Sequence, residues 1–321
     1  MPYTQKRQEE FTLFGNIPVR GAYHSDLALD NIVSSLFEPP QSWPHRAHSR
    51  FLELDGIRWH FQQLGTGPVV LLVHGTGGST HSWADCAAAL SEKFTVIATD
   101  LPGHGFTAVP PAVALARNVY TIDGMARALQ QLLDALQVQP VIAAAHSAGV
   151  PVLLRMALQR SIAPARIVGL CAALVAPPAW YVRLIAPIIG SVVESDAVAL
   201  SAAKLAAGTR IIRAMLDSTG STLTVEQLAR YELLCGMPTH VHAALAMMAR
   251  WDLPTLMRDL ATLETPLDVI AGRRDRWVPE AQLRRAVASV RGATYRVEEG
   301  GHLLMEERGE EVARWIGGET A

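Results

Sequence analysis

Cysteine is scarce in this chain of 321 residues, and its three copies lie far apart. Cys86, Cys171 and Cys235 form no Cys-x-x-Cys pair, and the histidines show no metal-ligand spacing, so neither a disulfide framework nor a zinc site is indicated. Free thiols are typical of a reducing compartment. We therefore expect a cytoplasmic protein that needs no metal and no cofactor.

An uninterrupted apolar run of membrane-spanning length is also missing. The longest candidate, residues 167–189, contains Pro177, Arg183 and Pro187, whereas a span needs about 20 consecutive apolar residues. No apolar segment follows the charged residues 1–10, which argues against a secretory signal. We expect no transmembrane helix, while a peripheral membrane contact through residues 167–189 stays open.

Charge of one sign is not concentrated anywhere in the sequence. Lys and Arg number 28 against 30 Asp and Glu, for a formal net charge of −2, and neither kind forms a block or a tail. This balance argues against a nucleic-acid partner. Hydrophobic residues make up 50% of the chain, which is enough for a large core and for an apolar pocket or contact surface.

Strand-like and helix-like segments alternate from about residue 50 onward. The strands are expected at 50–54, 57–64, 68–73, 94–98, 140–145, 166–175, 267–271 and 294–297, with a hairpin turn at Asp55-Gly56. The helices are expected at 82–93, 121–136, 150–158, 280–290 and 306–315. This alternation predicts an α/β fold with a mostly parallel central sheet and helices on both of its faces.

The alternation is interrupted between residues 176 and 264. This segment is helical in pattern, has no convincing strand, and is too long for a crossover loop. We interpret it as a helical cap inserted into a core formed by residues 41–175 and 265–321. Residues 1–40 have weak periodicity and are interpreted as an N-terminal extension.

The pentapeptide Ala145-His146-Ser147-Ala148-Gly149 follows an expected strand and precedes an expected helix. This context is that of a nucleophile elbow, a sharp turn that holds a serine in a strained conformation. Small residues two positions before and two after the serine let the strand and the helix pass closely. Ala145 stands where glycine is usual and adds one methyl group. We predict Ser147 as the catalytic nucleophile.

The glycine-rich residues 74–79 follow the expected strand 68–73. Such a turn can direct a backbone N–H at a developing oxyanion. We predict Thr76 as one donor, with Gly77 as the alternative, and Ala148, which follows the nucleophile, as the other. The turn lacks the lysine of a P-loop and the GxGxxG spacing, which argues against nucleotide binding.

Two further polar residues lie just beyond expected strands. Asp275 follows the strand 267–271 and His302 follows the strand 294–297. A histidine there can act as general base, and a carboxylate can orient it. On its own, Asp275 could equally pair with a neighbouring arginine. The order Ser147, Asp275, His302 is nevertheless the order of hydrolases with a nucleophile elbow, and we predict these residues as a catalytic triad.

The motifs HGTGGSTHSW, TDLPGHGFT, AHSAG, AGRRD and GGH together resemble the α/β-hydrolase superfamily over roughly residues 50–175 and 262–316. The resemblance implies the α/β-hydrolase fold. Its dehalogenases and epoxide hydrolases carry an aspartate nucleophile, and Ser147 argues against both. Esterases, lipases, thioesterases, carbon–carbon bond hydrolases and cofactor-free haloperoxidase-like enzymes remain.

A narrower resemblance rests on WPHRAHSR at residues 43–50 and RWH at 58–60, together with 74–83 and 100–107. These segments resemble the magnesium-chelatase accessory proteins of bacteriochlorophyll biosynthesis. No rule of the fold demands the run at 43–50, which makes it specific. The resemblance implies a role in photosynthetic pigment synthesis, a tetrapyrrole ligand and magnesium-chelatase subunits as possible partners.

Three functions are consistent with these observations. The chain is a serine hydrolase acting on an apolar ester, a non-catalytic accessory protein that binds a porphyrin or a chelatase subunit, or a generic esterase or haloperoxidase-like enzyme. The predicted substrate contacts are His74, Gly75, Trp83, His146, Trp180 and Trp277. Apolar residues of the cap, Trp180 and Met247 among them, line a ligand pocket or form the core of the cap.

Overall fold

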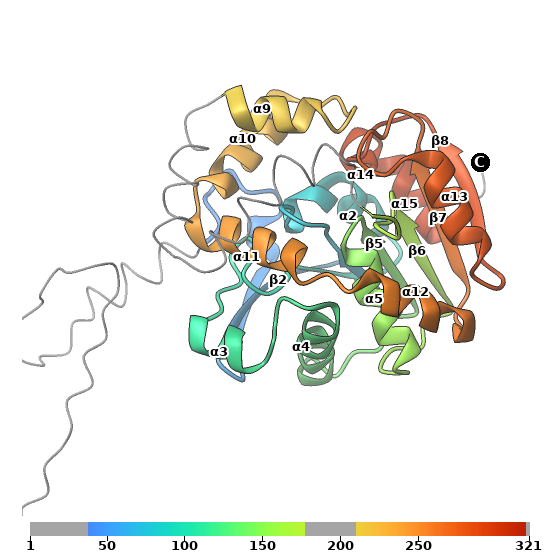
Figure 1. Cartoon of the computed structure of the whole chain (residues 1–321). Helices are drawn as coiled ribbons and strands as arrows, with labels where there is room; N and C mark the ends of the chain where they lie inside the picture. Colours follow the sequence, from blue (N-terminus) through green and yellow to red (C-terminus); the bar gives the residue numbers. More distant parts are fainter. Residues whose placement is uncertain (1–37, 177–209, 319–321) are drawn as a thin grey trace, which may run out of the picture. The chain divides into compact units, whose positions relative to one another are not determined.

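A computed structural model describes residues 38–176 and 210–318, which contain one eight-stranded sheet (Figure 1). The strand order is β1-β2-β4-β3-β5-β6-β7-β8. Strands β1 and β2 pair antiparallel, as do β2 and β4, and all later neighbours are parallel. The strands are β1 (Ser49–Leu54), β2 (Ile57–Leu64), β3 (Val69–Val73), β4 (Thr95–Thr99), β5 (Ile142–His146), β6 (Arg166–Leu170), β7 (Leu267–Gly272) and β8 (Thr294–Glu298). The predicted α/β-hydrolase fold is confirmed.

Helices connect most of the parallel strands. The α-helices are α2 (Ala84–Leu90), α3 (Pro111–Ala116), α4 (Ile122–Ala135), α5 (Gly149–Leu158), α9 (Arg210–Asp217), α10 (Val225–Cys235), α11 (Pro238–Ala249), α12 (Leu253–Asp259), α13 (Glu280–Ala288), α14 (Leu304–Glu307) and α15 (Gly309–Gly317). The 3-10 helices are η1 (Arg46–His48), η2 (Thr80–Trp83) and η3 (Leu260–Thr262).

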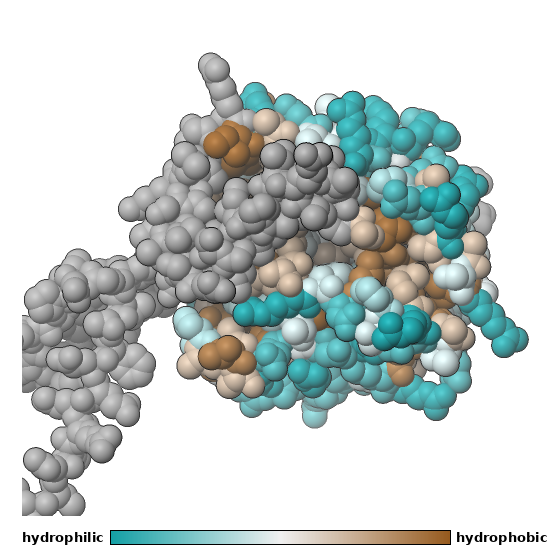
Figure 2. All heavy atoms as spheres, in the orientation of Figure 1, coloured by the Kyte–Doolittle hydropathy of each residue, from teal (hydrophilic) through white to brown (hydrophobic). Residues whose placement is uncertain are grey.

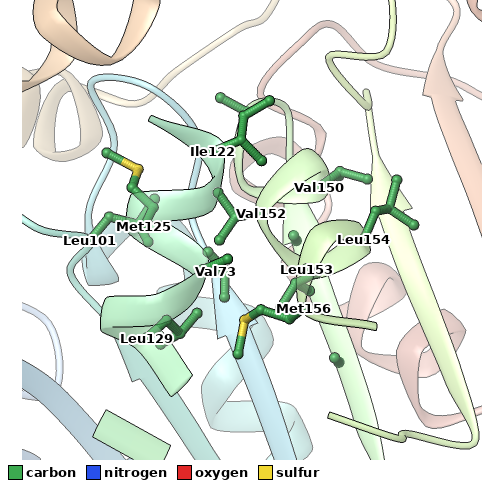
Figure 3. Close-up of a cluster of buried hydrophobic side chains, with 14 of the residues drawn as sticks. Val73, Leu101, Ile122, Met125, Leu129, Val150, Val152, Leu153, Leu154 and Met156 are labelled. Carbon is green, nitrogen blue, oxygen red and sulfur yellow. The ribbon is translucent and has the colours of Figure 1, made fainter. Parts of the chain in front are cut away.

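Two apolar layers enclose the sheet because successive side chains of a strand point to opposite faces. In β3, Leu71 and Val73 pack with α4, α5 and α13, whereas Val70 and Leu72 pack with α2 and α15. Figure 3 shows the first layer, where the apolar faces of α4 and α5 meet above β3. Full burial of one such side chain contributes about 1.5–3 kcal/mol to stability. This packing fixes the strand ends on which the site is built.

The hairpin between β1 and β2 follows from its two turn residues. Asp55 has φ 52° and Gly56 has φ 78°, the left-handed pair that a type I′ turn requires. The turn sets the register in which Leu54 faces Ile57 and Ser49 faces Gln62. Ser49 is thereby placed beside β2, where His60 lies.

Several predicted bounds differ from the structure. The strand expected at 166–175 ends at Leu170, because Cys171 turns into the left-handed region with φ 47°. The helix expected at 82–93 begins as the 3-10 helix η2 and ends as α2 at Leu90. The last helix is divided into α14 and α15 at Arg308. The short α3 was not expected.

Residues 210–259 contain the helices α9 to α12, within the segment that the sequence predicts as a cap. Residues 177–209, with Trp180, lie outside the described residues, as do residues 1–37, so the domain boundaries stay predictions.

Figure 2 shows apolar side chains in separate areas with hydrophilic residues between them. In the described ranges, none of the helices has the length and apolar character needed to cross a membrane.

Candidate active site

Ser147 lies at the turn between β5 and α5, where its backbone is strained. Its φ of 46° falls in the left-handed region, which few residues other than glycine adopt. Its N–H donates to Leu170 O at 2.9 Å, which fixes the turn against β6. Gly149 is needed behind it, because an added Cβ would lie 2.5 Å from His74 O. The turn has the geometry of a nucleophile elbow.

The extra methyl group of Ala145 is accommodated by its neighbour. Ala145 is fully buried in β5 and lies opposite Gly169 of β6 in the parallel register. Residues opposite each other in a sheet share a face, so the pair places only one methyl group between the strands and α5. The departure from the usual glycine therefore leaves the turn at Ser147 intact.

The structure brings the three predicted triad residues into one hydrogen-bonded chain. His302 Nδ1 lies 2.8 Å from Asp275 Oδ2, and His302 Nε2 lies 3.0 Å from Ser147 Oγ. An ionised carboxylate only accepts, so Nδ1 carries the proton and Nε2 is left to accept from the serine hydroxyl. The side chains of His302 and Asp275 are 6% and 1% exposed. This tautomer is the one that a general base requires.

Asp275 is held by backbone donors, and two of the arginines beside it pair with other carboxylates. Its Oδ1 accepts from the N–H groups of Trp277 and Val278 at 2.8 and 2.9 Å. Arg273 pairs with Glu299 and Arg274 with Glu307. The Trp277 ring stacks on the His302 ring with centroids 5.8 Å apart. The carboxylate therefore faces the histidine in a fixed orientation.

The loop that carries the predicted oxyanion donor lies against the elbow. Gly78 N donates to Gly75 O at 3.1 Å, and Gly77 has φ 72°, as the third residue of a type II turn requires. A Cβ added to Gly75 would lie 2.9 Å from Ser147 Cβ. Among the described residues, no protein atom accepts from the N–H of Thr76 or of Ala148. Both donors are thus available beside Ser147.

His74 and His146 support the two turns. Leu101 N donates to His74 Nε2 at 2.8 Å, so Nδ1 carries the proton and donates to Gly75 O at 2.7 Å. His146 Nε2 donates to His302 O at 2.9 Å. Burial lowers the pKa of both imidazoles, and the nearby His302 lowers that of His146 further. Neutral side chains at these positions hold backbone carbonyls without adding charge to the site.

The remaining predicted substrate contacts differ in their surroundings. Gly75 adjoins Ser147, and Trp277 stacks on His302. Trp83 is fully buried at the end of η2 in the apolar layer beneath α2 and α15. Trp180 lies outside the described residues. All of these contacts stay predictions, as do the roles of the triad and of the two oxyanion donors.

Among the described residues, one group of side chains has a spacing that could hold a metal ion. Cys171, Asp275 and His302 bring potential ligand atoms within 4.8 Å of one another. Two of the three belong to the triad, and their facing atoms already share a hydrogen bond. Burial and then the charge of Asp275 raise the pKa of the Cys171 thiol, which disfavours the thiolate that a metal binds. We assign the group to the triad.

Two buried titratable side chains lie outside the predicted set. His240 of α11 accepts from Gly105 N at 2.9 Å, so its Nε2 carries the proton and donates to Gly77 O at 3.2 Å. Burial, and then the nearby His74, lower the pKa of His240 to about 4. Glu306 of α14 accepts from the Tyr231 hydroxyl of α10, and burial raises its pKa to about 7. No local motif marks either residue, because their partners are distant in sequence.

Comparison with known proteins agrees with this architecture. The magnesium-chelatase 30 kDa subunit of Rhodobacter capsulatus is 34% identical over 274 residues, which are 83% of this chain and 92% of that protein. An alpha/beta hydrolase fold protein from Burkholderia ambifaria has a TM-score of 0.66 at 21% identity, over 83% of this chain and 96% of that one. The enol-lactonase of Burkholderia xenovorans LB400 has a TM-score of 0.64 at 19% identity, over 84% and 98%.

At these low identities the two structural likenesses show the fold alone. The model of the alpha/beta hydrolase family matches residues 70–315, a range that contains the elbow, the glycine-rich loop and both other triad residues. This match covers most of the chain. The chain belongs to the alpha/beta hydrolase family.

Proposed function

We propose that this chain is a serine hydrolase that cleaves an ester or acyl bond. The hydrogen-bonded chain from Ser147 through His302 to Asp275, with distances of 3.0 and 2.8 Å, is the observation that carries the proposal. It is supported by the left-handed backbone at Ser147 and by the N–H groups of Thr76 and Ala148, which no atom of the described residues accepts from. In the proposal, these features serve as the nucleophile, the oriented base and the electrostatic cradle of the reaction.

In the proposed reaction His302 Nε2 takes the proton of Ser147 as its Oγ attacks the acyl carbonyl. The N–H groups of Thr76 and Ala148 stabilise the oxyanion of the tetrahedral intermediate. The intermediate collapses, and the leaving alcohol takes the proton from His302. Water, deprotonated by the same Nε2, then releases the acid and restores Ser147. Asp275 stabilises the imidazolium in both halves of the cycle.

A fluorophosphonate probe tests this proposal without knowledge of the substrate. We expect the wild-type protein to be labelled and Ser147→Ala to lose all labelling, because the probe reacts only with an activated serine. Thr95→Ser provides a matched control, since it keeps the hydroxyl that donates to Gly67 O and changes no triad atom. Folded wild-type protein that stays unlabelled would contradict the proposal.

A second candidate function is an accessory role in magnesium insertion into a tetrapyrrole. The similarity to the magnesium-chelatase 30 kDa subunit of Rhodobacter capsulatus over 83% of this chain favours it. In this role the protein binds a porphyrin or a chelatase subunit, in the cytoplasm, and keeps the triad unused. The two candidates merge if the hydrolase substrate is itself a tetrapyrrole ester.

The two candidates differ in what Ser147→Ala does in cells. The test uses a host that makes magnesium tetrapyrroles and whose own version of this protein has been removed. A purely accessory role predicts that the variant restores normal pigment levels, whereas a hydrolase role predicts a clear loss of pigment. Rapid turnover of short p-nitrophenyl esters, without any change of porphyrin absorbance on mixing, would instead favour a generic esterase.

A further inference from the structure

A second hydrogen-bonded series of serine, histidine and aspartate side chains lies in the same domain as the triad. Ser49 Oγ lies 2.9 Å from His60 Nε2, and His60 Nδ1 lies 2.7 Å from Asp100 Oδ2. His60 and Asp100 are fully buried, and Ser49 is half-buried at the start of β1. This second series joins the same atom types in the same order as the triad does.

The carboxylate of the second chain holds the backbone around the predicted oxyanion loop. Asp100 Oδ1 accepts from Thr80 N at 2.7 Å, at the end of the loop that carries Thr76. Asp100 Oδ2 accepts from Phe106 N at 2.8 Å, in the loop that follows β4. The next residue, Leu101, donates to His74, which in turn holds Gly75 O. Asp100 thus joins the loop after β4 to the loop that carries Thr76 and that lies against Ser147.

The charge of Asp100 persists over the working range of an enzyme. Burial alone would favour the protonated acid. The pKa of Asp100 is nevertheless lowered to about 2 by the adjacent His60 and its hydrogen bond to Asp100, by the nearby His74 and by the Phe106 N–H. Charged acceptors make stronger hydrogen bonds than neutral ones. Thr80 N is therefore held by a charged acceptor at neutral pH.

We propose that Asp100 is a positioning residue for the oxyanion loop, and that His60 and Ser49 orient and partner its carboxylate. This inference rests on the proposed serine hydrolase function, since it assigns the purpose of the loop to catalysis. It also gives the serine of the run at residues 43–50 a physical role, because Ser49 is the last partner in the chain.

Ser49 differs from a nucleophile in the two features that make Ser147 reactive. It begins a strand that pairs regularly with β2, and it is not among the residues with a positive φ. Its hydroxyl faces the Gln62 side-chain amide at 3.4 Å, whereas Ser147 has two free backbone N–H groups beside it. The second chain has an oriented base without a place for an oxyanion.

The experiment follows the rate and the affinity of fluorophosphonate labelling in a graded series. Asp100→Asn leaves the N–H of Thr80 or of Phe106 facing an amide NH2, so the loop must shift. We expect the maximal labelling rate to fall by about 10–100-fold, because a displacement of about 1 Å at a reacting centre has an effect of this size. We expect about a 3–10-fold fall for His60→Gln and less than about 2-fold for Ser49→Ala. The probe concentration at half-maximal rate should stay within about 3-fold throughout, since oxyanion stabilisation acts on the reaction and not on binding.

Asp268→Asn is the matched control. Asp268 also accepts hydrogen bonds in the sheet, from Thr294 Oγ1 at 2.7 Å, but it lies at the amino end of β7, away from the elbow. Its loss should lower Tm and leave the labelling rate of the folded protein unchanged. If Asp100→Asn does not fold, His60→Gln carries the same test.

The outcomes separate the two proposals. Rates of Asp100→Asn and His60→Gln equal to that of the wild type, with only Tm lowered, would overturn the positioning role and leave the hydrolase proposal standing. Residual labelling of Ser147→Ala that disappears when Ser49 is also replaced would overturn the positioning role in favour of a second nucleophile. Unlabelled wild type would contradict both proposals.

Discussion

The protein contains two hydrogen-bonded chains of serine, histidine and aspartate that differ in what surrounds the serine. Ser147 lies on a strained turn with φ 46°, whereas Ser49 begins a regular edge strand. The distances within the chains agree closely, at 3.0 and 2.8 Å in the first and 2.9 and 2.7 Å in the second. Three residues in the correct order therefore do not define an active site. In our proposal, the backbone around the serine decides whether its hydroxyl can react.

The aspartates also differ in what they hold. Asp275 accepts from Trp277 and Val278 in its own loop, so its hydrogen bonds fix the triad itself. Asp100 accepts from Thr80 and Phe106 in two different loops. In our two proposals, one carboxylate orients a base, and the other orients the backbone on which the oxyanion donor lies. The predictions below test this division.

The largest expected effect separates the two histidines. His302→Gln removes the general base, and we expect the rate of p-nitrophenyl acetate hydrolysis to fall by about 10⁴-fold or more. His60→Gln leaves the base in place and should cost at most about 10-fold. Steady-state kinetics on both variants, corrected for folded fraction, measures the contrast. Equal losses in the two variants would mean that the chains share one role.

A smaller effect tests the contact between the oxyanion loop and the elbow. Gly75→Ala places a methyl group 2.9 Å from Ser147 Cβ and from His146 Nδ1, closer than real Cβ contacts, so the loop must move away. We expect about a 10²-fold fall in kcat, which is the loss that follows removal of one oxyanion donor.

Gly317→Ala is the control for this variant. Gly317 ends α15, and an added Cβ would come no closer than 3.9 Å to the Phe94 ring. This control should retain the full rate. A Gly75→Ala protein with normal kcat would show that the loop does not contribute to catalysis.

The smallest effect concerns pH and contrasts two buried carboxylates. Asp100 has a hydrogen-bond donor at each oxygen and a pKa of about 2, whereas burial raises the pKa of Glu306 from 4.5 to about 7. Below pH 4.5 Glu306 is protonated in the folded and the unfolded chain. As the pH rises to about 7 only the unfolded chain gives up the proton, so about 3 kcal/mol of stability is lost.

Glu306→Gln isolates this contribution. The amide keeps an acceptor for the Tyr231 hydroxyl and cannot ionise. We expect the wild-type Tm to fall by about 5–10 °C between pH 5 and pH 8. The Tm of the variant should change much less over the same range. Differential scanning calorimetry at the two pH values measures it. A wild-type Tm that rises with pH would contradict the assignment.

Much of the fold could be predicted from the sequence because its signals are local. Asp55-Gly56 specifies the hairpin, and apolar runs of about five residues mark the buried parallel strands. Parallel strands end at a common edge, so residues that follow three of them, Ser147, Asp275 and His302, were expected together. The triad geometry needed no information beyond strand order and chain order.

The features that could not be predicted depend on contacts between distant residues. His240 lies 163 positions from Gly77, and no periodicity connects them. The end of β6 was placed too late because the apolar run continues past Leu170, and only the left-handed turn at Cys171 stops the strand. Ser49, His60 and Asp100 come from β1, β2 and the loop after β4, and their meeting depends on the hairpin register.

The most direct measurement is the site of fluorophosphonate attachment in the wild-type protein, identified by mass spectrometry of its peptides. Our account predicts one phosphonyl group per molecule, on Ser147, and none on Ser49. Of these two serines, Ser147 alone combines an oriented base with neighbouring backbone N–H groups that no described atom accepts from. A phosphonyl group on Ser49, or no adduct on folded protein, would contradict it.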